Sequence, residues 1–161
     1  MSASVKLVGV GNRYRGDDGV GLVVIDSLAS RLPASMLKTS DGEITALIEC
    51  FESNEQVVII DAIDDTGQRA SPGCIVRIDA LEQSLQDTSL RSSSHAVGVG
   101  EAVEMARVLN KLPDKLSVIG VVGMDFSNKE GLTESVQLAA ESVAMQLEQE
   151  FKHSPNTFKE R

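Results

Sequence analysis

The amino-acid sequence predicts an α/β domain, a three-layer α/β/α sandwich with a mainly parallel sheet and helices on both faces. Two observations predict this fold class. Short apolar runs alternate along the chain with segments whose apolar residues recur at helical spacing, which is the pattern of consecutive βαβ units. In addition, residues 56–62 (QVVIIDA) and 116–122 (LSVIGVV) are apolar almost throughout, as expected of strands that helices cover on both sides.

Each element follows from its local pattern. Residues 4–11 (SVKLVGVG) form an apolar run that ends in glycines, and this favours a buried first strand. A first helix is expected along Val20, Val24, Leu28 and Leu32, with Pro33 as its stop. The next expected elements are a weak strand at 36–39, a helix at 45–51, strands at 56–62 and 74–78 (the latter at a sheet edge) and a helical turn at 79–85. A helix along Val99, Val103, Ala106 and Leu109 and a strand at 116–122 follow. The last helix is expected to be capped by Thr133, and its core face is Val136, Ala140, Val143, Leu147 and Phe151.

Length and composition limit the classes of function. A chain of 161 residues suits one domain, which we assign to residues 1–151, with residues 152–161 as a flexible C-terminal tail. The net charge of −9 argues against a nucleic-acid or anionic-membrane partner, since both require clustered positive charge. No apolar stretch approaches the roughly 18 residues of a membrane helix, and no signal peptide is apparent.

The two cysteines, Cys50 and Cys74, are far apart and form no CxxC pair. A zinc knuckle or a thioredoxin-type redox pair is therefore not supported. Free thiols are typical of a reducing compartment, so we expect a cytoplasmic protein, and we expect it to be a monomer.

Acidic residues cluster at the expected carboxyl ends of the strands, where open α/β sheets bind their ligands. Asp17 and Asp18 follow the first strand, Asp61 ends the third, and His95 precedes the helix that contains Val99. Four further acidic residues, Asp41, Asp64, Asp65 and Asp125, follow strands as well. Carboxylates together with an imidazole suit a divalent transition metal.

Ordinary structural roles compete with this interpretation. One of Asp17 and Asp18 can help to start the following helix, and Asp41 beside Gly42 is typical of a turn. Asp64 and Asp65 are expected in a solvated loop. Asp61 is harder to explain in this way, because a carboxylate directly after VVII is partly buried and needs a partner.

Several known catalytic motifs are absent. Gly9 and Gly11 resemble the start of a dinucleotide fingerprint, but Tyr14 occupies the third glycine position and two aspartates follow where a pyrophosphate would lie. The sequence contains no GK[ST], HExxH or GxSxG. A nucleotide-binding enzyme is therefore only a distant alternative.

Residues 9–28 (GVGNRYRGDDGVGLVVIDSL) resemble the opening signature of the nickel–iron hydrogenase maturation proteases, endopeptidases that trim the C-terminus of the hydrogenase large subunit. Other segments resemble the family in the same order, and together they cover roughly residues 5–150. They are Asp41-Gly42, residues 57–62 (VVIIDA), Ser94-His95 with Gly98, residues 118–123 (VIGVVG) and residues 131–133.

The resemblance implies that Asp18, Asp61 and His95 contact a metal and carry the catalysis. The metal would be nickel that arrives with the substrate, a large-subunit precursor whose C-terminal extension is removed after nickel insertion. One departure is Glu43, where the family usually has a second glycine, so that a position tolerant of positive φ is lost or an extra carboxylate points toward the site. The alternative from another class is a non-catalytic, metal-dependent docking or chaperone module for a metalloenzyme precursor.

Overall fold

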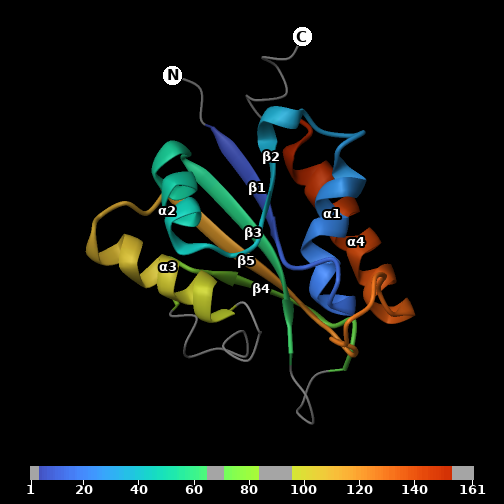
Figure 1. Cartoon of the computed structure of the whole chain (residues 1–161). Helices are drawn as coiled ribbons and strands as arrows, with labels where there is room; N and C mark the ends of the chain where they lie inside the picture. Colours follow the sequence, from blue (N-terminus) through green and yellow to red (C-terminus); the bar gives the residue numbers. More distant parts are fainter. Residues whose placement is uncertain (1–3, 65–70, 84–95, 154–161) are drawn as a thin grey trace.

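A computed structural model of the chain, which describes residues 4–64, 71–83 and 96–153, contains one five-stranded sheet with the strand order β2-β1-β3-β5-β4 (Figure 1). The strands are β1 (Val5–Val10), β2 (Leu37–Ser40), β3 (Gln56–Ile63), β4 (Ile75–Asp79) and β5 (Lys115–Val122). Strands β2, β1, β3 and β5 are parallel, and only β4, at the edge, is antiparallel to its neighbour β5. The α/β fold with a mainly parallel sheet is confirmed, as is the edge position of the strand near residue 75.

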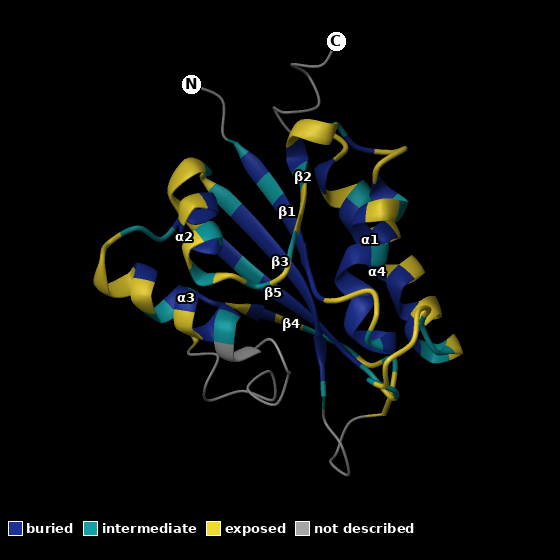
Figure 2. Cartoon of the chain, in the orientation of Figure 1, coloured by how far each residue is buried: buried dark blue, intermediate teal, exposed yellow. Residues whose placement is uncertain are grey.

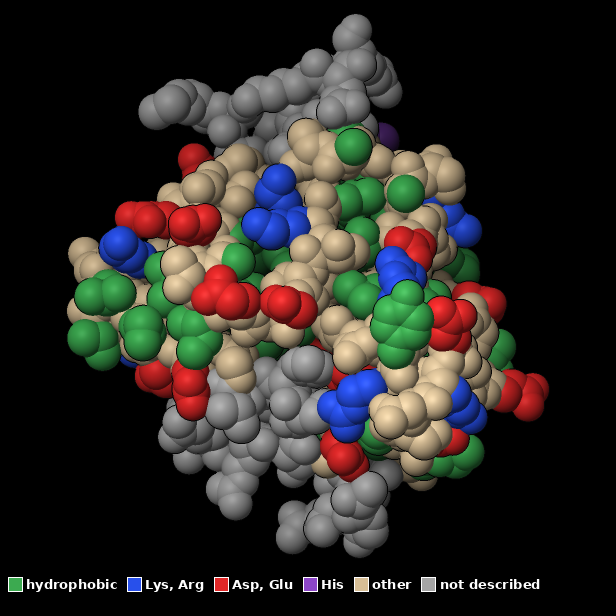
Figure 3. All heavy atoms as spheres, in the orientation of Figure 1, with side chains coloured by type: hydrophobic (Ala, Val, Ile, Leu, Met, Phe, Trp, Pro, Cys, Tyr) green, Lys and Arg blue, Asp and Glu red, His purple; other side chains and the backbone are tan. Residues whose placement is uncertain are grey.

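Helices cover both faces of the sheet. On one face lie α1 (Val20–Leu28) and α4 (Glu134–Phe151), and on the other lie α2 (Ile44–Ser53) and α3 (Ala96–Val108). Figure 2 shows β1, β3 and β5 almost wholly buried between these two layers, whereas the edge strands β2 and β4 are partly exposed. The outer surfaces of the helices are exposed, and Figure 3 shows acidic and basic side chains interspersed on one face of the molecule. The core is aliphatic apart from Phe51 and Phe151 among the fully buried side chains. The described helices include none that is long and apolar enough to cross a membrane.

Glycines bring α1 unusually close to the sheet. A Cβ atom on Gly21 would collide with the carbonyl oxygens of Ile60 and Val10, and one on Gly9 would collide with the Gly21 carbonyl. Only hydrogen at these Cα positions permits the helix backbone to rest on β1 and β3. As a result, η1 (Gly16–Gly19), the 3₁₀ turn that leads into α1, lies at the carboxyl ends of these strands and contacts β3.

Three details differ from the sequence prediction. The first helix ends at Leu28, and the buried Leu32 lies beyond it, after a turn. Leu109 is 51% exposed because α3 ends at Val108, and Asn110, with a φ of 58°, turns the chain away. The predicted helical turn at 79–85 is a non-helical turn over residues 80–83, where Leu81 N donates to Asp79 Oδ1; residues 84 and 85 lie outside the described part.

The last helix begins at the predicted place, and its predicted core face is buried. Thr133 occupies the N-cap position, but its hydroxyl makes no capping hydrogen bond to the helix. The hydroxyl instead contacts Asp17, a residue 116 positions earlier in the chain. A short second 3₁₀ turn, η2 (Ala34–Met36), leads into β2.

Candidate active site

The carboxyl ends of β1, β3 and β5 meet at one edge of the sheet, which is the lower edge in Figure 1. Three segments converge there: η1 after β1, the end of β3, and the loop of residues 123–133 after β5. Such an edge is where ligands bind in open α/β sheets.

Asp18 lies in η1 and is completely buried. Its backbone carbonyl accepts a hydrogen bond from Asn12 N at 3.3 Å. Gly11, with a φ of 154°, passes so close to this carbonyl that any side chain there would collide with it. The glycines of the sequence GVGNRYRGDDG thus serve to fold η1 back against the end of β1, with Asp18 inside.

Asp61 is the sixth residue of β3 and is only 3% exposed. It follows Ile60, which pairs with Gly9 of β1, so it is level with the end of β1. Strand alternation places its side chain on the face covered by α2 and α3. Its direct neighbour in β5 is Gly120, which has no side chain to fill the adjacent space. Asp61 Oδ1 accepts a hydrogen bond from Ala62 N at 2.8 Å.

His95 lies outside the described residues, but the helix that follows it is well placed. Ala96 begins α3, and α3 packs on the sheet face toward which Asp61 is directed. Near its start, a Cβ on Gly98 would lie 2.8 Å from the Gly42 carbonyl, so this end of α3 abuts the turn after β2. The structure brings Asp18 and Asp61 to one edge, while the part played by His95 stays a prediction.

A complete metal site is not assembled by the described residues alone. Among them, no group of three or more histidine, cysteine, aspartate or glutamate side chains is placed to hold one ion. The donor set of two carboxylates and an imidazole would need His95, and its roles in metal contact and catalysis stay predictions. The chemistry of the two buried carboxylates is nevertheless that of ligands for a divalent cation.

Asp17, the neighbour of Asp18, has a structural role that the sequence did not reveal. It is fully buried, and its carboxylate accepts hydrogen bonds from three backbone amides of the 123–133 loop: Oδ2 from Met124 N at 2.8 Å and Asp125 N at 3.0 Å, and Oδ1 from Thr133 N at 2.7 Å. The Thr133 hydroxyl lies 2.9 Å from Oδ2 and 3.1 Å from Oδ1. Asp17 therefore fastens the loop after β5 to η1.

Backbone contacts strengthen this connection. Asp17 N donates to the Asp125 carbonyl at 2.8 Å, and Gly16 N donates to the Lys129 carbonyl at 2.8 Å. Gly16 has a φ of 56°, and a side chain there would collide with the Asp125 carbonyl. We call this set of contacts between η1 and residues 123–133 the Asp17 clasp. It holds the short turn that contains Asp18 in place.

The other acidic residues near the edge have local partners. Asp125 Oδ2 lies 2.8 Å from Lys129 Nζ, and hydrogen bonds from Lys129 and Ser127 hold the pKa of Asp125 well below its usual range. Asp41 Oδ1 accepts from Glu43 N at 3.1 Å, as expected of a turn residue. These two carboxylates therefore have structural roles in their own loops.

Glu43, the departure from the family pattern, is the N-cap of α2. Its carboxylate accepts from Thr45 N and Ala46 N, both at 2.9 Å, and the hydrogen bond from Thr45 is the first cause of its lowered pKa. Its φ is −64°, so the backbone at this position needs no glycine. Neither possibility raised by the sequence therefore applies to Glu43. No positive-φ position is lost, and the carboxylate caps α2 and is not directed at the site.

Asp64 differs from the prediction of a solvated loop. It is half-buried, and its Oδ1 is shielded from solvent without a hydrogen-bond partner in the described part of the chain. Asp65 lies outside the described residues. The sequence carried no signal for this burial, because Asp64 follows β3 at a position where the chain leaves the sheet.

Fold and site together define an α/β/α domain with buried carboxylates at the carboxyl edge of a parallel sheet. Comparison with known proteins then identifies the family. The family model for hydrogenase maturation protease matches residues 42–150, about two thirds of the chain, and the chain belongs to this family.

Individual relatives are similar over almost the whole length. The chain is 24% identical over 147 residues to the hydrogenase 2 maturation protease of Escherichia coli K12, covering 89% of this chain and 87% of that protein. Among solved structures, the hydrogenase maturating endopeptidase HybD from E. coli superimposes with a TM-score of 0.74 at 24% identity, covering 89% of each chain. The [NiFe] hydrogenase maturation protease HybD from Thermococcus kodakarensis has a TM-score of 0.70 at 21% identity, covering 91% of this chain and 97% of that one.

Proposed function

We propose that the protein is a cytoplasmic endopeptidase that removes the C-terminal extension of a nickel–iron hydrogenase large-subunit precursor after nickel insertion. The observation that supports this proposal is the position of two buried carboxylates, Asp18 and Asp61, at the same carboxyl edge of the sheet in a chain of this family. The precursor-bound nickel is the feature that the enzyme recognises. The metal is thus part of the substrate.

The donor chemistry of the edge suits this role. Asp18 and Asp61 offer carboxylate oxygens, and His95 is one residue before the helix that packs on the Asp61 face. Such a mixed set of three ligands leaves coordination positions for the substrate's own ligands and for water, unlike a closed structural site. A cation also relieves the repulsion between two carboxylates that share a buried site.

Two routes lead to hydrolysis of the scissile peptide bond. A divalent ion lowers the pKa of a bound water and polarises a carbonyl oxygen. Alternatively, one of the aspartates takes the proton from the attacking water as a general base. In both routes Asp18 and Asp61 must be held rigidly, and the Asp17 clasp supplies this rigidity for Asp18.

The decisive experiment is processing of a nickel-loaded precursor, followed by the mobility shift on a gel and by mass spectrometry of the new C-terminus. We expect Asp61→Asn and His95→Ala to abolish trimming, with an unchanged far-UV circular dichroism spectrum. Asp26→Asn is the matched control, since it makes the same chemical change at an exposed residue that pairs with Arg13 on the surface. Full activity in both site variants would refute the assignment.

A docking or chaperone module predicts a different outcome in the same experiment. Such a module would form a stable stoichiometric complex with the precursor and release no trimmed product. Nickel-free precursor completes the design, because a nickel-recognising protease leaves it intact. Cleavage that is equally fast without nickel would contradict recognition through the metal.

A further inference from the structure

A pocket lies away from the candidate active site, between β1, β2 and α2. It has a volume of about 310 Å³, within the range of roughly 300–1,000 Å³ that is usual for small-ligand pockets. Its position is set by Lys6, the second residue of β1, and Ser53, the last residue of α2. The pocket is therefore at the amino end of β1, opposite the edge that holds Asp18. Its lining residues are Lys6, Lys38, Glu49, Cys50, Ser53 and Asn54.

Two lysines give this pocket an unusual charge. Six basic residues of the described chain form ion pairs with carboxylates, but neither Lys6 nor Lys38 does so within that part. Lys6 Nζ donates one hydrogen bond, to the Ser35 carbonyl at 2.7 Å, and an ammonium group has two further donors. The pocket therefore contains two lysines that form no ion pair within the described residues, in a chain whose net charge is −9.

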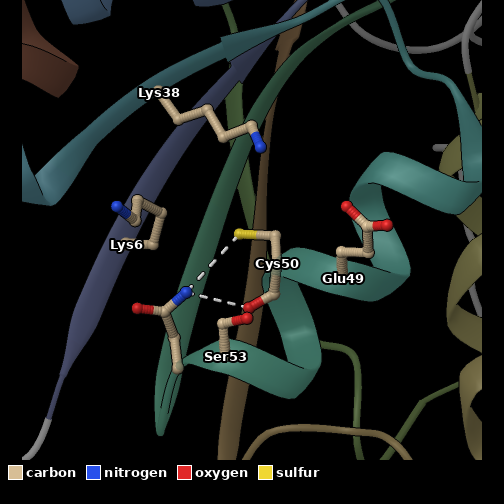
Figure 4. Close-up of a pocket in the computed structure, with 6 residues that line it drawn as sticks. Lys6, Lys38, Glu49, Cys50 and Ser53 are labelled. Atoms are coloured by element: carbon tan, nitrogen blue, oxygen red, sulfur yellow. Dashed lines mark hydrogen bonds between the residues drawn. The ribbon is translucent and has the colours of Figure 1, made fainter.

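The side chains around the Cys50 thiol leave its lysine side open to an anion. Lys6 and Lys38 come from adjacent strands and lie on that side, whereas Glu49 lies on the other side (Figure 4). The Lys38 ammonium is directed toward the sulfur, and the Lys6 ammonium is turned toward the Ser35 carbonyl to which it donates. Asn54 Nδ2 donates to the Cys50 carbonyl at 2.9 Å and to the Cys50 sulfur at 3.8 Å, so both N–H groups of this amide are directed at Cys50. The Ser53 hydroxyl is a further potential donor in the lining.

We propose that this pocket binds an oxyanion, held by the ammonium groups of Lys6 and Lys38 with Ser53 as a neutral donor. The ligand class is a phosphate or carboxylate group. Either a free small anion or an acidic side chain of the precursor supplies this chemistry, and the experiment separates the two sources. The proposal does not require the protease activity.

Cys50 provides a reporter inside the pocket. Burial raises the pKa of the Cys50 thiol, and the positive charges of Lys38 and Lys6 act in the opposite direction. An anion bound to the lysines cancels their effect and also blocks access to the sulfur. Both effects lower the rate of alkylation, because the thiolate is the reactive form.

The experiment compares the alkylation rates of the two cysteines by iodoacetamide, quantified for each residue by mass spectrometry. Cys74 is exposed and serves as an internal control. Inorganic phosphate is titrated against sodium chloride of equal ionic strength. At a phosphate concentration ten times its dissociation constant, we expect about a tenfold slower reaction at Cys50, because only the unliganded fraction reacts. Cys74 should be unaffected.

Single variants test the two lysines. Lys38→Gln and Lys6→Gln should each abolish the phosphate-dependent slowing, which is scored as the ratio of rates with and without phosphate because the variants also change the basal rate. Lys152→Gln, at the end of α4, is the control and should retain the full effect. Equal slowing of both cysteines, or an unchanged ratio in Lys38→Gln, would overturn the proposal.

The precursor assay then identifies the source of the anion. If phosphate inhibits trimming competitively and Lys38→Gln raises the KM for precursor without changing kcat, the pocket holds an acidic group of the precursor. If trimming is indifferent to phosphate while Cys50 is still protected, the ligand is a free anion. Both outcomes support the anion site. If the precursor is not trimmed at all, the proposed protease function fails, but the alkylation experiment still tests the anion site.

Discussion

Replacing Asp17 by asparagine tests the structural role of the Asp17 clasp. The buried carboxylate accepts from three backbone amides, through Oδ2 for Met124 and Asp125 and through Oδ1 for Thr133. Asparagine has the same shape but only one accepting oxygen. If that oxygen faces Met124 and Asp125, the amide NH₂ of asparagine points at Thr133 N, and two donors confront each other.

The expected cost follows from these contacts. A buried donor that loses its partner costs about 1–3 kcal/mol. The two remaining hydrogen bonds lose the assistance of the negative charge, which is worth about 1 kcal/mol each. The sum is about 3–5 kcal/mol, a large part of a typical unfolding free energy of about 5–15 kcal/mol. For a domain of this size, each kcal/mol lowers Tm by about 2–4 °C.

Urea unfolding followed by far-UV circular dichroism measures this loss, because the chain has no tryptophan for fluorescence. Thr133→Val is the graded comparison: it removes the hydroxyl contact but keeps the backbone amide, and should cost about 1 kcal/mol. Per folded molecule, Asp18→Asn should reduce trimming more than Asp17→Asn. If Asp17→Asn destabilises the protein no more than Thr133→Val does, Asp17 does not fasten the loop of residues 123–133 as described.

Two further predictions concern the helices that frame the edge. Gly21→Ala should destabilise the domain by about 1–3 kcal/mol in spite of the better helix propensity of alanine, because its Cβ would displace α1 from β1 and β3; an unchanged urea midpoint would show that α1 can shift without cost. Glu43→Gln should lower Tm at neutral pH, since a carboxylate whose folded pKa is depressed stabilises the fold above its ordinary value of 4.5. That contribution is lost as the pH falls through the depressed pKa, so the Tm difference between wild type and Glu43→Gln should disappear in acid; a constant difference would contradict the cap.

Much of the architecture could be read from local patterns. Alternation of apolar runs with helical stripes predicted every strand near its observed position, because buried strands and amphipathic helices leave strong periodic signals. The edge position of β4 was predicted as well. The predicted ends of two helices, at Leu32 and Leu109, were wrong. At both places the helix ends before the apolar residue, although the helical spacing of apolar residues continues up to it.

The roles of the individual acidic residues were less accessible. Asp17 and Asp18 have the same local pattern in the sequence, as adjacent carboxylates after an apolar strand. Only the tertiary structure showed that Asp17 receives four donors from residues more than 100 positions away. Such a long-range contact leaves no periodic signal, because its partners, Met124, Asp125 and Thr133, are ordinary loop residues.

Local hydrophobic periodicity and the rules of parallel sheets were sufficient to predict the α/β fold class, the order of the elements and the placement of Asp18 and Asp61 at the carboxyl edge. They did not predict which of two adjacent aspartates fastens the loop, that Glu43 caps α2, or that Lys6 and Lys38 share a pocket. These properties depend on side chains from separate elements, and the distances between such side chains exist only once the sheet and its helices have packed.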